Sequence, residues 1–302
     1  MSIFSNSTLG FIGLGVMGGA MCRNMASKHP ADVYCFDTSE AAVAAVLDSG
    51  AKSTSSVLEL AERADVIFLS LPGGRQVETV CIGKDGIAHA SNLPSIIVDL
   101  STTTVADARS IAEQLSAKHI RFADAPVART REAAQRGELS IMVGADEDDF
   151  KQIEPLLFYI GSDITRCGGV GCGQVVKLAN NALVFENTLA LAEMMVVAER
   201  AGVAPETLLD AVAKGSGDSF VLRNHGRKSL LPRAYPEKAF PPEYAVKDLG
   251  YIRELADQVG VRARVVEQTT RYYQAAIDHG WTGRYFPVVR EVIDAGIDPD
   301  NA

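Results

Sequence analysis

One lysine and two asparagines have the residue types and the spacing that proton-transfer chemistry requires. Lys177 lies three residues before Asn180 and four before Asn181, so a helix would place all three on one face. They open a segment, residues 174–201, that has no proline and no glycine and that we predict to be one helix. A helix N-terminus disfavours cations and so lowers a lysine's proton affinity, and such lysines serve as acid–base groups. The alternative is a solvated lysine beside two surface amides.

The predicted helix is apolar around nearly its whole circumference, which indicates burial from several sides. The glycine-rich segment 168–173 precedes it, and Gly202 and Pro205 follow it, as at a helix end. A membrane span is the alternative. The polar and charged residues within the segment argue against that alternative; these are Lys177, Asn180, Asn181, Glu186 and Glu193. We therefore expect a core helix between two layers of structure.

A glycine-rich turn follows the first predicted strand, residues 8–13. Gly13-Leu14-Gly15-Val16-Met17-Gly18 leads into a predicted helix, residues 16–28. In a G-x-G-x-x-G turn of this kind the first glycine permits the tight turn, the second admits a pyrophosphate and the third lets helix and strand pack closely. N–H groups at the helix start then bind the anion. The pattern predicts a dinucleotide site.

A second predicted strand, residues 32–36, ends at Asp37, nineteen residues past Gly18. An acceptor for the adenosine ribose hydroxyls is expected at this distance from the glycine turn. Thr38 follows, where an NADP enzyme often has an arginine, so we predict NAD as the cofactor. A strand-end capping role for Asp37 is the alternative.

Strands and helices then alternate through the first half of the chain. Such alternation predicts an α/β fold, a Rossmann-type doubly wound parallel sheet whose ligands bind at the carboxyl ends of the strands. Leu71-Pro72 and Ser101-Thr102 directly follow two predicted strands, residues 66–71 and 96–99, and are placed at that edge. We predict an NAD-binding domain over residues 1–170. Residues 171–302 are predicted to form an all-helical substrate and oligomerisation domain, entered through the long interdomain helix.

A further predicted strand runs into a turn that contains proline and arginine, Asp124-Ala125-Pro126-Val127-Ala128-Arg129-Thr130. Arginine binds carboxylate, sulfonate or phosphate through paired donors. We therefore predict that a small anionic substrate binds Arg129 and the backbone of residues 128–130. A solvent-exposed loop arginine is the alternative.

Composition narrows the classes of partner. A net charge of −9 argues against nucleic acid, which normally requires a basic surface. The five cysteines are scattered and form no C-x-x-C pair, as expected for a reducing cytosol without disulfides or structural zinc. The acidic run 146–149 lacks the spacing of a metal site. We expect a cytoplasmic protein that binds neither metal nor membrane.

Together these motifs resemble the 3-hydroxyacid dehydrogenase family, which includes 3-hydroxyisobutyrate dehydrogenase and tartronate semialdehyde reductase. The resemblance covers nearly the whole chain and rests on residues 10–18, Leu71-Pro72, residues 99–102, 124–127 and 173–181, and Lys247-Asp248-Leu249. It implies an NAD-dependent interconversion of a small 3-hydroxy acid and its semialdehyde by a homodimer or homotetramer. The resemblance also implies that Lys177 is the catalytic residue, that Asn181 binds the substrate, and that Thr102 and Lys247 border the nicotinamide.

Two sets of site residues follow from the motifs and the resemblance. The substrate-binding set is Ser101, Ala128, Arg129, Thr130, Asn180 and Asn181. The cofactor-binding set is Gly13, Gly15, Val16, Met17, Gly18, Asp37, Leu71, Pro72, Thr102 and Lys247.

One departure from the family pattern affects the substrate. Relatives usually have Ser-Gly-Gly after Asp-Ala-Pro-Val, whereas this chain has Ala128-Arg129-Thr130. An Arg-Thr pair here is similar to sulfolactaldehyde reductases of the same family, so sulfonate binding by Arg129 is one alternative. Alternatives of another class are a non-catalytic dinucleotide-binding protein and a methyltransferase.

Overall fold

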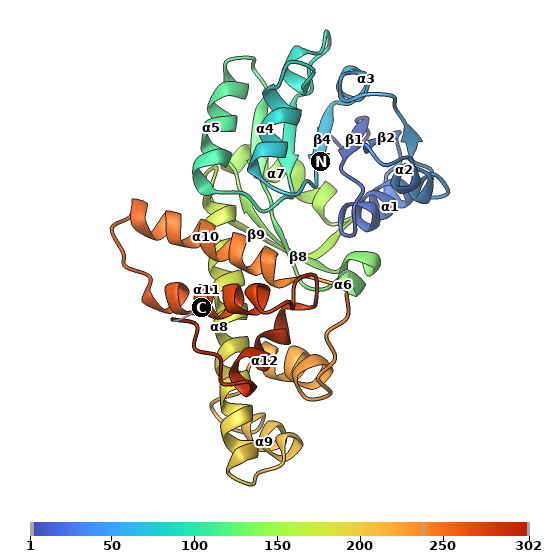
Figure 1. The fold of residues 1–302 in the computed structure, drawn as a ribbon. Helices are drawn as coiled ribbons and strands as arrows, with labels where there is room; N and C mark the ends of the chain where they lie inside the picture. The colour runs from blue at the N-terminus through green and yellow to red at the C-terminus, as the bar shows by residue number, and fades with distance from the viewer. Residues whose placement is uncertain (1–2, 238, 301–302) are drawn as a thin grey trace. The chain divides into compact units, whose positions relative to one another are not determined.

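The computed structural model describes residues 3–237 and 239–300 and divides into two compact units (Figure 1). The N-terminal unit ends at Lys177 and the C-terminal unit begins at Leu178. The division therefore falls inside the long helix α8 (Cys172–Arg200), seven residues after the predicted domain boundary at residue 170. The first turn of α8 belongs to the N-terminal unit because it is hydrogen-bonded to strand ends of that unit.

A nine-stranded sheet forms the centre of the N-terminal unit. Its strands are β1 (Leu9–Ile12), β2 (Val33–Phe36), β3 (Lys52–Ser53), β4 (Val66–Leu69), β5 (Ile96–Asp99), β6 (Arg121–Asp124), β7 (Val127–Ala128), β8 (Leu139–Gly144) and β9 (Gly161–Gly168). The order is β3-β2-β1-β4-β5-β6-β8-β7, with β9 beside β8. The strands from β1 to β6 are parallel, as predicted. Strand β8, by contrast, runs antiparallel to β6 and β7.

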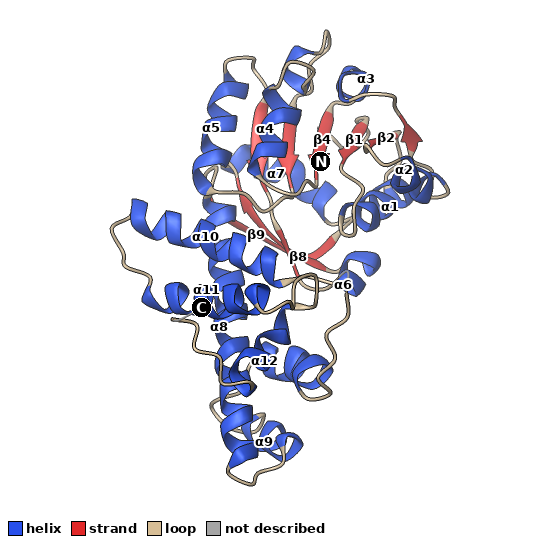
Figure 2. Cartoon of the chain, viewed as in Figure 1, coloured by secondary structure: helices blue, strands red, loops and turns tan. Residues whose placement is uncertain are grey.

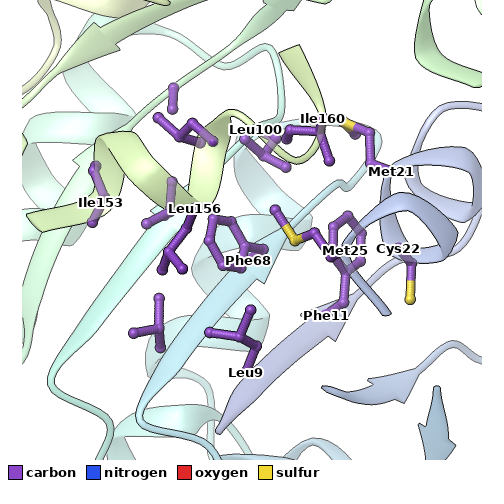
Figure 3. Packing of buried hydrophobic residues seen from close by; sticks show 14 of the residues in the cluster. Leu9, Phe11, Met21, Cys22, Met25, Phe68, Leu100, Ile153, Leu156 and Ile160 are labelled. Carbon is purple, nitrogen blue, oxygen red and sulfur yellow. The ribbon is translucent and has the colours of Figure 1, made fainter. Parts of the chain in front are cut away.

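Helices cover the sheet on both faces, which explains why the central strands are continuously apolar. They are α1 (Gly18–Lys28), α2 (Glu40–Leu47), α3 (Val57–Arg63), α4 (Gly74–Ile82), α5 (Val105–Ser116), α6 (Arg131–Arg136) and α7 (Glu147–Leu157), with the 3-10 turn η1 (Ile87–His89). Alternate residues of β4 enter two separate cores: Phe68 packs with Phe11 and Met25 (Figure 3), while Ile67 and Leu69 join the other cluster.

The C-terminal unit is helical, and Figure 2 shows no strand arrow among its described residues. After α8 come α9 (Pro205–Val212), the π-helix η2 (Leu222–Leu230), α10 (Pro242–Gln258), α11 (Arg264–Asp278), the 3-10 turn η3 (Phe286–Val288) and α12 (Val289–Asp294). By length and hydropathy alone α8 would also qualify as a membrane span, a property shared by core helices of soluble proteins. Its Phe185 is buried against Tyr273 and Phe286, which fits a core helix.

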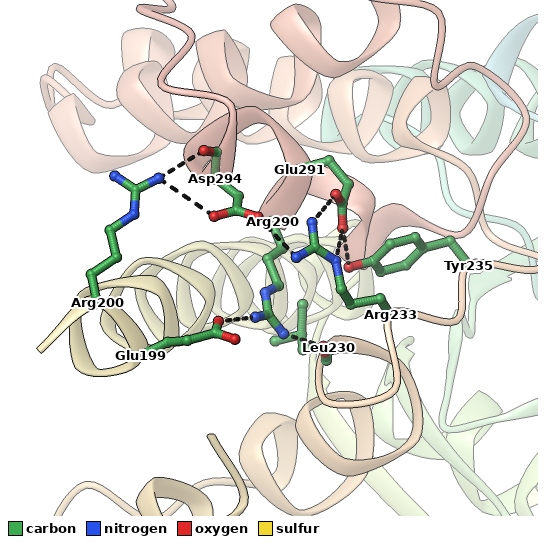
Figure 4. A network of polar contacts seen from close by, with 8 residues as sticks. All are labelled: Glu199, Arg200, Leu230, Arg233, Tyr235, Arg290, Glu291 and Asp294. Carbon is green, nitrogen blue, oxygen red and sulfur yellow. Dashed lines mark hydrogen bonds and ion pairs between the residues drawn. The ribbon is translucent and has the colours of Figure 1, made fainter. Parts of the chain in front are cut away.

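A charged network joins the C-terminal end of α8 to α12 (Figure 4). Arg290 is 1% exposed and donates to the Glu199 carboxylate at 2.7 Å and to the Leu230 carbonyl at 2.5 Å. Beside it Arg233 pairs with Glu291 and Asp294. A buried guanidinium is tolerated only when paired in this way, so the network specifies how these helices pack.

Candidate active site

The glycine turn between β1 and α1 is built by contacts that exclude side chains at two of its three glycines. Gly13 has φ +94°, and a Cβ there would lie 2.3 Å from the Ser70 carbonyl oxygen. A Cβ on Gly18 would lie 2.0 Å from the Gly13 oxygen. At Gly15, by contrast, a Cβ would meet no protein atom within 4 Å. The space beside Gly15 is thus open, which fits the close approach of a dinucleotide's pyrophosphate.

The helix after this turn begins later than predicted. Helix α1 starts at Gly18, whereas the sequence pattern placed its start at Val16. The turn occupies the two intervening positions, so that Val16 is exposed and Met17 packs partly against the core. Val16 and Met17, which belong to the predicted cofactor-binding set, therefore lie in the turn and not in the helix.

Asp37 follows β2 and is hydrogen-bonded to the same turn. Its Oδ2 accepts the Leu14 N–H at 2.6 Å, and its Oδ1 accepts the Ser39 N–H at 2.8 Å. These bonds hold a partly exposed carboxylate beside the glycine turn, and each oxygen keeps further acceptor capacity. The position of Asp37 suits an acceptor for ribose hydroxyls, so this region fits a bound dinucleotide.

The ends of β4 and β5 are joined through Ser101. The Leu71 N–H donates to Ser101 Oγ at 2.9 Å, and the Ser101 N–H donates to Asp99 Oδ1 at 3.0 Å. Adjacent parallel strands thus place Leu71, Pro72, Ser101 and Thr102 along one edge of the sheet. In this structure the Ser101 hydroxyl oxygen accepts a hydrogen bond from the backbone at the end of the neighbouring strand.

A buried carboxylate holds the start of α8. Asp124, at the end of β6, accepts the Gly171 N–H at 2.6 Å and the Gln174 N–H at 2.8 Å. Gly173 lies so close to this carboxylate that a Cβ would be 2.7 Å from Asp124 Oδ2. The orphan N–H groups of a helix start are commonly satisfied by side-chain oxygens, and here the partner is a strand-end carboxylate.

The side chain of Gln174 makes a second connection from α8 to the sheet. Its Nε2 donates to the Ser101 carbonyl at 2.8 Å, and its Oε1 accepts the Thr103 N–H at 3.1 Å. Gln174 is fully buried. The amide therefore hydrogen-bonds the two residues on either side of Thr102.

Lys177 and the two asparagines occupy the next turns of α8. Lys177 is 9% exposed and Asn181 is 7% exposed. Asn181 donates to Asp248 Oδ2 at 2.7 Å and accepts from Asn180 Nδ2 at 3.1 Å, so both ends of its amide are oriented. Lys177 thus lies one helical turn from an amide with a defined direction.

Lys247 lies beside the carboxylate that orients Asn181. Its Nζ is 3.3 Å from Asp248 Oδ1 and lies over the rings of Tyr244 and Tyr251. Helix α10 begins at Pro242, which places Lys247 in its second turn. Its side chain is 31% exposed.

The arginine loop has an unusual backbone. Arg129 has φ +87°, in the left-handed region that favours glycine. Ala128 pairs with Ser140 of β8, and Thr130 caps α6 through the Ala133 N–H. Helix α6 was not predicted within this loop.

The Arg129 guanidinium has three acceptors in the structure. Its Nη1 donates to the Glu138 carbonyl at 2.7 Å and to Ser162 Oγ at 2.8 Å, and its Nη2 pairs with Asp163 at 2.7 Å. The structure therefore brings the Arg129 guanidinium to the β8–β9 edge, where it bonds Glu138, Ser162 and Asp163. Its Nε–H and one Nη2 proton remain without a partner among the described residues.

Four residues hydrogen-bonded within the candidate site were not named as site residues by the sequence analysis: Asp99, Asp124, Gln174 and Asp248. Both strand-end aspartates close apolar strands at the carboxyl edge of the sheet, a signal that would have marked them. Gln174 follows the glycine loop directly, but its partners lie 71 and 73 residues away in the chain. Such long-range bonds leave no local pattern.

Asp99 and Asp124 are buried neighbours in the sheet register. Burial raises the pKa of Asp99 to about 7, against the hydrogen bonds from Ser101. Burial likewise raises the pKa of Asp124 to about 6, against the N–H groups of Gly171 and Gln174. Near neutral pH the edge of the sheet beneath α8 therefore has carboxyl groups that titrate.

The Asp99→Asn variant is expected to show a weaker dependence of stability on pH than the wild type. A carboxyl whose pKa is raised from 3.8 to about 7 by folding stabilises the fold fully below pH about 4. That contribution, of the order of 4 kcal/mol, is lost as the pH rises through about 7. Calorimetric unfolding at pH 4 and pH 8 measures it, with the exposed Asp32→Asn as control; equal pH slopes in variant and wild type would contradict the assignment.

The described residues contain no group of three histidine, cysteine, aspartate or glutamate side chains able to hold a metal ion. The candidate site combines lysine and amide side chains on α8 with hydroxyl and carboxyl groups at the ends of the strands. The arrangement is suited to binding anions and moving a proton.

Comparisons with known proteins agree with this geometry. Residues 8–169 match the model of the NAD binding domain of 6-phosphogluconate dehydrogenase, and residues 171–285 match a model described as NAD-binding of NADP-dependent 3-hydroxyisobutyrate dehydrogenase. The chain is 36% identical to 2-(hydroxymethyl)glutarate dehydrogenase of Eubacterium barkeri, over 88% of each chain. It is 37% identical to 2-hydroxy-3-oxopropionate reductase of Escherichia coli, over 74% of this chain and 75% of that one.

A solved structure also resembles the whole chain. The 3-hydroxyisobutyrate dehydrogenase of Salmonella typhimurium superposes with a TM-score of 0.83 at 26% identity, covering 95% of this chain and all of that one. The Rossmann-type unit and the helical unit are thus shared with proteins of one enzyme class. The chain belongs to the 3-hydroxyacid dehydrogenase family of NAD(P)-dependent oxidoreductases, which includes 3-hydroxyisobutyrate dehydrogenase and 2-hydroxy-3-oxopropionate reductase.

Proposed function

We propose that this enzyme uses NAD to interconvert a small 3-hydroxy acid and its semialdehyde, with Lys177 as the acid–base residue. One observation carries the proposal: Lys177 is nearly buried on α8, whose start is hydrogen-bonded to the ends of β5 and β6. Relatives named for 2-(hydroxymethyl)glutarate, 2-hydroxy-3-oxopropionate and 3-hydroxyisobutyrate support the substrate class. They favour it over a sulfonate substrate.

Proton transfer is assigned to Lys177 and orientation to the amides that follow it. In oxidation Lys177 takes the proton of the substrate hydroxyl, and in reduction it returns one to the developing alkoxide. Asn181 hydrogen-bonds the hydroxyl oxygen, in an orientation set by Asp248 and Asn180. The bound nicotinamide supplies the site that accepts or gives the hydride.

Cofactor binding is assigned to the glycine turn and the strand ends that adjoin it. The open space beside Gly15 admits the pyrophosphate, and Asp37 accepts the adenosine ribose hydroxyls. The Asp37 carboxylate would repel the 2′-phosphate of NADP, and Thr38 offers no compensating positive charge. NAD is therefore preferred over NADP. Thr102 and Lys247 are assigned to the nicotinamide by the family resemblance.

The anionic group of the substrate is assigned to the loop of residues 128–130. Arg129 keeps two N–H donors beyond its bonds to Glu138, Ser162 and Asp163. These donors and the backbone of Ala128 and Thr130 can bind a carboxylate while the guanidinium stays where the structure has it. Arg129 then supplies binding energy to substrate and transition state alike.

Initial rates with a small substrate panel test this function. NAD reduction is measured with 3-hydroxyisobutyrate and 2-(hydroxymethyl)glutarate, and NADH oxidation with 2-hydroxy-3-oxopropionate and sulfolactaldehyde. One carboxylate substrate is expected to turn over. With it, Arg129→Ala should raise KM by about tenfold or more with a smaller change in kcat, as when uniform binding is lost.

Arg136→Ala provides the matched control, because Arg136 is an exposed arginine of the same segment that pairs with Glu138. It should leave KM unchanged. An unchanged KM in Arg129→Ala would remove Arg129 from the substrate site. NAD binding without turnover of any substrate in the panel would instead contradict the substrate class.

The proposal extends to a cytoplasmic homodimer or homotetramer without nucleic-acid or membrane partners. The net charge of −9 supports the absence of nucleic acid. Leu183, Met194 and Val197 leave an exposed apolar stripe along α8, which supports self-association. Light scattering on the purified protein tests the subunit number.

A further inference from the structure

We propose that Gln174 is a positioning residue for the reaction, which sets where Lys177 stands relative to the segment 101–103. The inference rests on the proposed catalytic role of Lys177. Gln174 precedes Lys177 by three residues on α8, so the two side chains lie on the same face about one turn apart. Whatever fixes the Gln174 side chain therefore fixes the level and the rotation of the helix at Lys177.

The side chain of Gln174 bonds the backbone of the segment that follows β5 and does not cap its own helix. Its amide donates to the Ser101 carbonyl at 2.8 Å and accepts the Thr103 N–H at 3.1 Å. The residue enclosed by this pair of bonds is Thr102, which is assigned to the nicotinamide. One side chain thus connects the helix of the proposed acid–base residue to the backbone proposed to border the hydride acceptor.

This connection is separate from the one that holds the helix end. Asp124 receives the backbone N–H groups of Gly171 and Gln174, and it would do so with any side chain at position 174. The Asp124 contacts anchor the start of α8, whereas the Gln174 amide fixes its rotation toward Ser101 and Thr103. Removing the amide should leave α8 folded and displace Lys177 slightly.

Small displacements of a reacting group are costly, since about 1 Å can lower the rate by about 10²-fold. Gln174→Met keeps the length of the side chain and removes both hydrogen bonds. We expect kcat to fall by about 10²-fold, while the Kd for NADH changes little. Thr188→Val is the matched control, because Thr188 is equally buried on α8 and its hydroxyl bonds only within the helix, to Val184.

A double-mutant cycle separates positioning from a purely structural role. Residues that act as a unit have non-additive effects on rate. If Gln174 acts through Lys177, single-turnover rates of Gln174→Met combined with Lys177→Ala should equal those of Lys177→Ala alone. A further 10²-fold loss in the double variant would overturn the proposal, as would wild-type kcat in Gln174→Met.

The failure of this inference differs from the failure of the proposed function. An inactive Lys177→Ala beside a fully active Gln174→Met would reject the positioning role alone. Near-normal turnover of Lys177→Ala would reject both, because no acid–base group would then remain to be positioned. A loss in Thr188→Val as large as in Gln174→Met would also reject the positioning role.

Discussion

Lys177→Ala is expected to lower kcat by about 10²- to 10⁴-fold, the usual contribution of general acid–base catalysis. Lys177 is nearly buried on α8, so bulk water cannot easily replace its side-chain nitrogen as the acid–base group at the reacting oxygen. The Kd for NADH should change little, because the cofactor is assigned to the glycine turn and the strand ends. Stopped-flow measurement of NADH formation, together with fluorescence titration of NADH, gives both quantities.

Two controls sharpen this result. Lys214→Ala removes an exposed lysine of the C-terminal unit and should leave kcat unchanged. Small primary amines added to Lys177→Ala should restore part of the rate, because they supply the missing acid–base group. Near-wild-type turnover of the variant would remove Lys177 from the chemistry.

Gly15→Ala is expected to weaken NAD binding strongly without destabilising the fold. A Cβ at this position meets no protein atom within 4 Å, so the folded chain tolerates it. It would instead occupy the space assigned to the pyrophosphate. An overpacking cost of about 1–3 kcal/mol corresponds to a Kd raised by about 5- to 150-fold. Titration calorimetry with NAD and calorimetric unfolding measure the two effects.

The other glycines of the turn provide the contrast. Gly13→Ala should lower the unfolding temperature, because its φ is +94° and the added Cβ would collide with the Ser70 oxygen. Gly215→Ala, in a loop with room for the methyl group, should change neither property. An unaltered NAD affinity in Gly15→Ala would show that the pyrophosphate does not lie against this turn.

Local patterns were sufficient to predict the parallel part of the sheet and the long helix. Apolar strands bounded by turn residues gave β1, β2, β4 and β5 to within two residues, and the proline-free segment predicted α8 (Cys172–Arg200). The antiparallel direction of β8 was not predicted, because strand direction depends on pairing with distant segments. The π-helix η2 (Leu222–Leu230) lies in a basic, irregular-looking stretch whose composition does not indicate a helix.

The sequence analysis named those residues of the candidate site that stand in local motifs. It missed residues whose partners are distant in the chain. Helical spacing places Lys177 and Asn181 on one face of α8, the family resemblance assigns their roles, and the glycine turn follows from its motif. Gln174 could not be assigned, since its partners are set by how α8 meets the sheet. The ion pair of Arg129 with Asp163 likewise joins residues 34 positions apart, which no local pattern reveals.

Transfer of deuterium from substrate to cofactor tests the central claim most directly. A 3-hydroxy acid that turns over is labelled with deuterium at its hydroxyl-bearing carbon and incubated with the wild-type enzyme and NAD. The account predicts one deuterium at C4 of the nicotinamide in the NADH formed, seen by mass spectrometry. NADH without the label, or no reduction of bound NAD by any 3-hydroxy acid, would contradict it.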